Sequence, residues 1–195
     1  MNLFLKRLGG FYKYRFLMQQ LVTKDIKLKY RRSFLGYLWS ILNPLMVMVI
    51  MVIVFSNMFR SDIVNFPVYL IIGQTLYNFM SESTTQAIFS IIGNASLLKK
   101  TYVPKYVFTV SKITSSFVNM VFALGALVIV FVVCRVVPNV FYLFIPVILL
   151  QEYLFCLGLG MLLAQGCVFF RDIQHIYNAV LTAWMYLSLI HISEP

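Results

Sequence analysis

The chain has 195 residues, of which 61% are hydrophobic and only 11% are charged. Soluble domains average about 25% charged residues, so this composition excludes an ordinary water-soluble domain and predicts a membrane protein. The formal net charge of +10 would suit nucleic-acid binding, but nine of the 16 basic residues precede residue 33 and the others lie at or near the ends of apolar runs. This distribution is typical of membrane topology, so we expect no nucleic-acid partner.

The first predicted element is a basic amphipathic helix within a cytoplasmic segment, residues 1–34. Such a helix is suited to the cytoplasmic headgroup layer of a membrane. The simpler alternative is a basic anchor that only fixes the orientation of the chain. The apolar side holds Phe11, Tyr14, Met18, Leu21, Val22, Ile26 and Tyr30, and the basic side holds Lys13, Lys24, Lys27 and Arg31.

Five apolar runs follow this segment. Four are long enough to cross a bilayer, which takes about 20 residues, and they cover residues 35–59, 66–92, 107–133 and 139–170. A fifth, incomplete run covers residues 176–190, and residues 191–195 form an atypical tail. We therefore predict an all-α, polytopic helical membrane protein with a transmembrane domain at residues 35–190.

Two of these runs contain unusual residues. Asn43-Pro44 lies inside the first run, where a transmembrane helix tolerates proline if neighbours satisfy the freed carbonyl. The pair predicts either a kink beside a transport path or a simple packing bend. The second run is polar in its middle, around Asn78 and Glu82. Because ionisable groups are costly in lipid, this stretch is expected to face protein, water or cargo.

The basic residues also predict the orientation. With a cytoplasmic N-terminus, the inside segments 1–34, 93–112 and 169–175 hold 14 of the 16 lysines and arginines, against Arg60 and Arg135 outside. This asymmetry favours the N-in arrangement.

The second inside segment, "NASLLKKTYVPK", predicts a short helix. Asn94 or Ser96 would cap it, and Pro104 would separate it from the next run. An exposed pair of leucines beside two lysines suits the groove of a partner protein. An ordinary basic loop is the alternative.

The third inside segment contains Arg171 and Asp172 at the end of the fourth run. Arg171 is expected to anchor that helix at the membrane surface, and Asp172 to cap the start of the next helix. A functional hinge is the other interpretation.

The sequence contains no phosphate-binding loop, no H-E-x-x-H motif and no nucleophile elbow. The three cysteines lack metal-ligand spacing. We therefore predict no catalytic residue, no metal site and no enzyme activity for the chain on its own. Uphill transport would take its energy from another chain.

Three stretches resemble the permease subunit of ABC-2 type exporters of cell-surface polysaccharide, a group that includes O-antigen, capsule and teichoic-acid export. They are "LVTKDIKLKYRRSFLGYLWSILNPL" at 21–45, "NASLLKKTYVPKYVFTVSKI" at 94–113 and "LGLGMLLAQGCVFFRDIQHI" at 157–176. The resemblance implies a dimer of six-span permeases in the bacterial inner or cytoplasmic membrane. It also implies two cytoplasmic ATPase subunits that bind ATP and Mg²⁺, with no cofactor on the permease itself.

The resemblance further implies a cargo of polysaccharide, usually carried on undecaprenyl diphosphate, and a tunnel between the permeases. The residues it suggests for the ATPase interface are Lys24, Asp25, Lys27, Lys29, Arg31, Arg32, Leu97, Leu98, Lys99, Lys100, Pro104, Lys105, Arg171 and Asp172. Those we consider for the tunnel lining are Tyr37, Trp39, Asn43, Tyr77, Asn78 and Glu82.

The sequence departs from the family at its end, where "MYLSLIHISEP" replaces the expected continuation into a sixth span. We read this as a truncated or non-native end. The alternatives to polysaccharide export are a permease for a small molecule or drug, a membrane enzyme of lipid-linked sugar metabolism, and a purely structural anchor.

Overall fold

The computed structural model describes residues 12–31, 33–58, 66–100, 102–135 and 140–193. All regular structure in these ranges is helical, which confirms the predicted all-α class. In chain order the elements are α2 (Arg15–Tyr30), the 3₁₀ helix η1 (Gly36–Leu38), α3 (Trp39–Met58), α4 (Phe66–Ser90), α5 (Ala95–Lys100), α6 (Tyr106–Val133), the 3₁₀ helix η2 (Val140–Phe144), α7 (Ile145–Phe169) and α8 (Ile173–Ser193).

Each of the five apolar runs forms a long helix, and Pro44 lies inside the first of them, α3. Among the described residues, three segments are long and apolar enough to cross a membrane, namely Gly36–Val54, Tyr106–Val133 and Tyr142–Phe169. The helices α4 and α8 are not among these three. The polar middle of α4 lowers its hydropathy. The packing of the bundle explains how a helix with this polar stretch fits among apolar helices.

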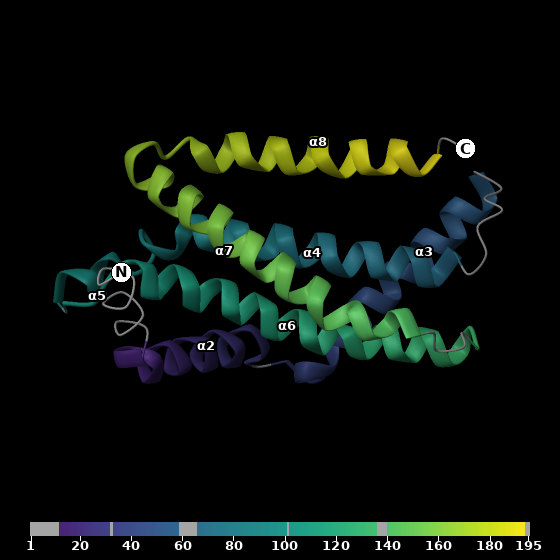
Figure 1. The fold of residues 1–195 in the computed structure, drawn as a ribbon, viewed down its shortest axis with the longest axis horizontal. Helices are drawn as coiled ribbons and strands as arrows, with labels where there is room; N and C mark the ends of the chain where they lie inside the picture. Colours follow the sequence, from purple (N-terminus) through teal and green to yellow (C-terminus); the bar gives the residue numbers. More distant parts are fainter. Residues whose placement is uncertain (1–11, 32, 59–65, 101, 136–139, 194–195) are drawn as a thin grey trace.

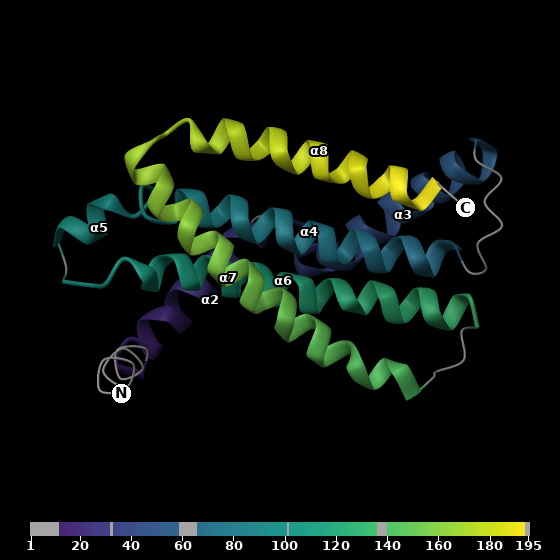
Figure 2. The same cartoon turned by 45° about the horizontal axis from the view of Figure 1, so that its top comes forward.

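The polar helix α4 lies at the centre of the bundle, packed against α3, α6 and α7 and touching α8. Figures 1 and 2 show it running beside α6, with α7 crossing the two helices at an angle. A polar helix that is enclosed by other helices exposes less of its polar surface to lipid. Its central position therefore accounts for the polar residues of the second run.

The core has two parts. One joins α4, α6 and α7 and includes Phe79, Ala87, Ile113 and Cys156. The other joins α3, α4 and α6 around Ile71 and further apolar residues. The outer faces of α3 and α7 expose large aliphatic side chains, as expected for helices that face lipid tails.

Several buried serine and threonine hydroxyls donate to carbonyls of their own helices. In α4, Thr84 donates to the Met80 carbonyl at 2.6 Å and Ser90 to the Ala87 carbonyl at 2.6 Å. In α6, Ser111 donates to the Val107 carbonyl at 2.7 Å. This local bonding removes most of the cost of burying a hydroxyl.

The last helix, α8, is attached to α4 by two tyrosines. Tyr77 of α4 donates to the Leu181 carbonyl at 2.8 Å, and Tyr177 of α8 donates to Thr84 Oγ1 at 2.8 Å. Hydrogen bonds between membrane helices hold them together where apolar burial gives little preference for one partner.

Gly160 allows α7 to approach α4 and α6 closely. A Cβ at this position would lie 2.8 Å from Ile113 Cδ1 and 3.0 Å from Ala87 Cβ. Gly158, two residues earlier, has open space around the same position. The close approach of α7 to α4 and α6 thus depends on Gly160 and not on Gly158.

We predict that Gly160→Val destabilises the protein by about 1–3 kcal/mol, because the added methyl groups overpack this contact. Thermal unfolding of the purified protein in detergent would show a lowered Tm. Gly158→Val is the matched control, since its side chain enters open space. Equal Tm values for the two variants would contradict this packing role.

Candidate functional site

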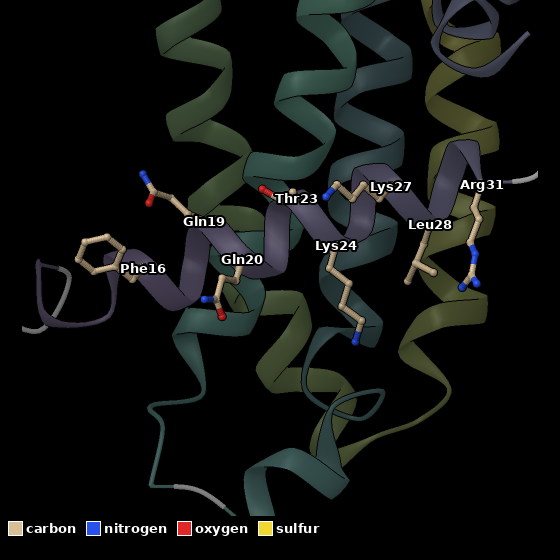
Figure 3. A pocket seen from close by; sticks show the side chains of 8 residues that line it. All are labelled: Phe16, Gln19, Gln20, Thr23, Lys24, Lys27, Leu28 and Arg31. Carbon is tan, nitrogen blue, oxygen red and sulfur yellow. The ribbon is translucent and has the colours of Figure 1, made fainter.

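The basic helix α2 packs along α6 with its apolar face. Met18, Val22 and Ile26 are partly buried, whereas Lys24 and Lys27 are exposed. The predicted amphipathic helix is therefore confirmed, and the structure gives its apolar face a protein partner. Figure 3 shows α2 running across the helices behind it.

Two ion pairs fasten α2 to the bundle. Asp25 Oδ1 lies 2.8 Å from Lys112 Nζ of α6, and Lys29 Nζ lies 2.7 Å from Glu82 Oε1 of α4. All four side chains are partly exposed, between 21% and 43%, so water screens them and each pair contributes only about 0.2–1 kcal/mol. Their polarity is opposite, since α2 supplies the anion to α6 and the cation to α4. This crossed arrangement favours one register of α2, because a shifted helix would place like charges together.

The carboxylate of Glu82 collects further donors. Its Oε1 accepts Gln86 Nε2 at 2.9 Å and Asn119 Nδ2 at 3.2 Å, in addition to Lys29. Asn119 Oδ1 in turn accepts the Tyr30 hydroxyl at 3.3 Å. We call Lys29, Tyr30, Glu82, Gln86 and Asn119 the Glu82 network; it joins α2, α4 and α6.

The network continues into the turn between α2 and α3. The Tyr30 hydroxyl shares a hydrogen bond with Ser40 Oγ of α3. The Tyr30 ring lies 4.9 Å from the Tyr37 ring, centroid to centroid. Gly36 begins η1 with φ +49°, a left-handed conformation that glycine adopts without steric cost. The turn therefore places Tyr37 against Tyr30.

The outward face of α2 forms a shallow depression (Figure 3). Its lining residues are Phe16, Gln19, Gln20, Thr23, Lys24, Lys27, Leu28 and Arg31. Three of them are cationic and none is acidic, because Asp25, the only acid of α2, is turned toward Lys112. This face is therefore complementary to an acidic or phosphate-bearing surface.

The short helix predicted after residue 93 is confirmed as α5. Asn94 directly precedes it, and its carbonyl accepts the Leu98 N–H at 3.0 Å. The Asn94 amide donates to the Ser90 carbonyl at 2.8 Å instead of capping α5 through its oxygen, and thereby ties α5 to the end of α4. Leu97, Lys99 and Lys100 are exposed.

The remaining residues of this set are also placed. Leu98 and Pro104 are partly buried and Lys105 is exposed. Arg171 and Asp172 are exposed in the turn between α7 and α8. The Asp172 carbonyl accepts the His175 N–H at 2.9 Å, so Asp172 stands immediately before α8 as expected.

These segments lie at one end of the molecule. Figures 1 and 2 show the start of α2, the whole of α5 and the α7–α8 turn at the same end of the bundle. The Tyr14 hydroxyl donates to the Tyr102 carbonyl at 3.3 Å, which links the start of α2 to the segment that follows α5. Arg32 lies outside the described residues.

The residues considered for a tunnel lie on η1, α3 and α4 and meet different neighbours. Tyr37, Trp39 and Asn43 are exposed on η1 and α3. On α4, Tyr77 bonds to α8 and Glu82 bonds to α2 and α6, while Asn78 is exposed. The polar middle of α4 thus faces several neighbours, and a tunnel lining stays a prediction.

Similarity to known proteins identifies the family of this chain. The ABC-2 type transporter family matches residues 17–193, which is most of the chain. The chain belongs to the ABC-2 type transporter family. The match confirms the resemblance to ABC-2 type exporter permeases, and the chain is a multi-pass membrane protein.

Relatives within the ABC-2 family include named export permeases. The O-antigen export system permease protein RfbA of Myxococcus xanthus is 33% identical over 177 residues, covering 91% of this chain and 68% of that protein. RfbA of Klebsiella pneumoniae is 29% identical, covering 89% of this chain and 68% of that protein. The capsule polysaccharide export inner-membrane protein CtrC of Neisseria meningitidis is 25% identical, covering 86% and 64%. The chain thus spans about two thirds of the length of these ABC-2 proteins.

The sequence did not reveal the partners of α2 in this ABC-2 protein. Lys112 and Asn119 carry no sequence signal of their own for these contacts. Asp25 and Lys29, which we consider for the ATPase interface, bond to Lys112 and Glu82, and their place in that interface stays a prediction. The scarcity of acids could have indicated these contacts, since the chain has only six acidic residues. A single acid within a basic helix and a single acid within a polar span each require a nearby cation.

We predict that the Asp25–Lys112 pair is weakly stabilising. In a double-mutant cycle with Asp25→Asn and Lys112→Met, the coupling energy from thermal or chemical unfolding should be about 0.2–1 kcal/mol. Lys24→Gln is the control, because Lys24 lies on the outward face, and it should leave stability unchanged. Strictly additive effects of the two substitutions would contradict the pairing.

Proposed function

We propose that this chain is the membrane permease subunit of an ATP-driven exporter that moves a cell-surface polysaccharide across the bacterial cytoplasmic membrane. The observation that carries the proposal is the 33% identity to an O-antigen export permease over 91% of the chain. The similarity to a capsule export protein points to the same class of cargo. The proposal includes a second copy of the permease and an undecaprenyl-diphosphate-linked cargo.

The energy would come from two cytoplasmic ATPase subunits with ATP and Mg²⁺ bound to them. The chain has no phosphate-binding loop of its own. The α5 helix, with the exposed Lys99 and Lys100, lies at one end of the bundle together with the start of α2 and the α7–α8 turn. The positive-inside rule assigns this end to the cytoplasm, where an ATPase would dock.

The geometry suggests how ATP hydrolysis would reach the membrane helices. The α5 helix connects α4 to α6 directly in the chain, and α2 is ion-paired to the same two helices. Closure of the ATPase dimer would press on the outward face of α2 and on α5. Both inputs converge on α4 and α6, and their repacking would shift the permease between two arrangements.

The function can be tested in a strain from which only the permease gene has been deleted. We expect the surface polysaccharide to disappear and its lipid-linked precursor to accumulate inside the cell, because synthesis continues without export. Expression of the full-length permease should restore the surface polymer.

Two other results would contradict this function. Loss of the lipid-linked precursor would indicate a membrane enzyme of sugar metabolism. Unchanged surface polysaccharide together with increased sensitivity to toxic compounds would indicate a permease for small molecules.

A second prediction concerns α5. In the full-length permease, Lys99→Glu combined with Lys100→Glu should repel an acidic docking surface and abolish export, while the protein still inserts in the membrane and the ATPase still hydrolyses ATP. Lys99→Arg with Lys100→Arg preserves the charge and should export normally. Normal export by the glutamate variant would rule out coupling through these lysines.

A further inference from the structure

We propose that Glu82 is the positioning residue that transmits movement of α2 to the centre of the permease. This inference rests on the proposed transport function, and it assigns to one carboxylate the connection between the basic helix and the membrane core. Glu82 touches neither ATP nor, in this proposal, the cargo. It acts by holding Lys29.

Three donors from three helices converge on one oxygen of Glu82. Lys29 of α2 lies at 2.7 Å, Gln86 of α4 at 2.9 Å and Asn119 of α6 at 3.2 Å from Oε1. Gln86 and Asn119 are neutral amides that hold the carboxylate in place. Lys29 supplies the positive charge that offsets the cost of a carboxylate inside a helix bundle.

Lys29 differs from the other cations of α2 in its direction. Lys24, Lys27 and Arg31 line the outward face, where a partner could dock (Figure 3). Lys29 points instead toward α4, where its Nζ meets Glu82. The helix therefore has a basic face toward the outside and one lysine toward α4. A rigid helix with contacts on both sides can pass a force from a docked partner to α4.

The helix that receives this contact, α4, packs against four other helices, as α6 does. The Asp25–Lys112 pair connects α2 only to α6, whereas Glu82 lies on α4, which packs against α3, α6 and α7 and bonds to α8. A displacement of α2 that carries Lys29 thus reaches the centre of the bundle through Glu82. The exposed fractions, 43% for Lys29 and 32% for Glu82, leave the pair close enough to water to move during a transport cycle.

The experiment uses the full-length permease with its own ATPase in proteoliposomes, and measures polysaccharide transported per ATP hydrolysed. We expect Lys29→Glu and Glu82→Lys each to lower this ratio about tenfold, which lies within the usual range of coupling between sites. The double variant with both substitutions restores opposite charges. Its ratio should recover most of the loss, because the Gln86 and Asn119 amides can turn their oxygens toward a lysine.

A control separates coupling from the general effect of altering a membrane carboxylate. Glu152→Gln removes the acid of α7, which does not take part in the Glu82 network, and should leave the ratio unchanged. Glu82→Gln retains the size of the side chain, so it should fold and still lower the ratio, because a neutral amide holds a lysine less strongly.

The outcomes distinguish this inference from the proposed function. If the unaltered permease transports no polysaccharide, the proposed function fails. If it transports normally and Glu82→Gln keeps the full ratio, Glu82 has no positioning role. If the single charge reversals lose coupling and the charge exchange does not recover it, the Lys29–Glu82 contact is overturned as the connection. If a single reversal fails to assemble, the exchange variant and Glu82→Gln decide the question.

Discussion

The structure depends on a constraint imposed by α4, which carries polar side chains through the middle of the bundle and packs against α6, whose buried face also holds serine, threonine and asparagine. A polar group in such surroundings is stable only when it has a partner. Hydroxyl groups such as that of Thr84 are satisfied within their own helix. Glu82 and Tyr77 reach across to α2, α6 and α8 instead. The polar side chains of α4 thus determine which helices can pack around it.

The same constraint attaches a surface helix to the bundle. α2 has an apolar face suited to α6, but apolar contact alone would tolerate a helix that slides or rotates. The charges of Asp25 and Lys29 remove that freedom, because each meets an opposite charge on a different helix. The ion pairs are individually weak. They contribute little to stability, but they fix the position of α2 on the bundle. A helix that transmits movement needs a defined position more than a tight attachment.

Much of the fold followed from the sequence because the decisive signals are local. Apolar runs fix the long helices through their length, Asn94 marks the start of α5, and Asp172 precedes α8. The orientation of the polar residues was not accessible in this way. Lys29 and Glu82 are 53 residues apart, and no periodicity indicates which cation meets which acid. The inward turn of Lys29 depends on how α2 crosses α6, which only the packed structure defines.

The spacing of Asp25 and Lys29 bears on how the protein is made. They stand four residues apart on α2, the spacing at which an acid and a following lysine attract each other on an isolated helix. Ribosomes synthesise α2 before Glu82 and Lys112 exist. During that interval the two residues can neutralise one another, and they exchange partners once α4 and α6 have entered the membrane. The charges of α2 can therefore stay neutralised until its partners are in place, and its docking belongs to a late stage of assembly.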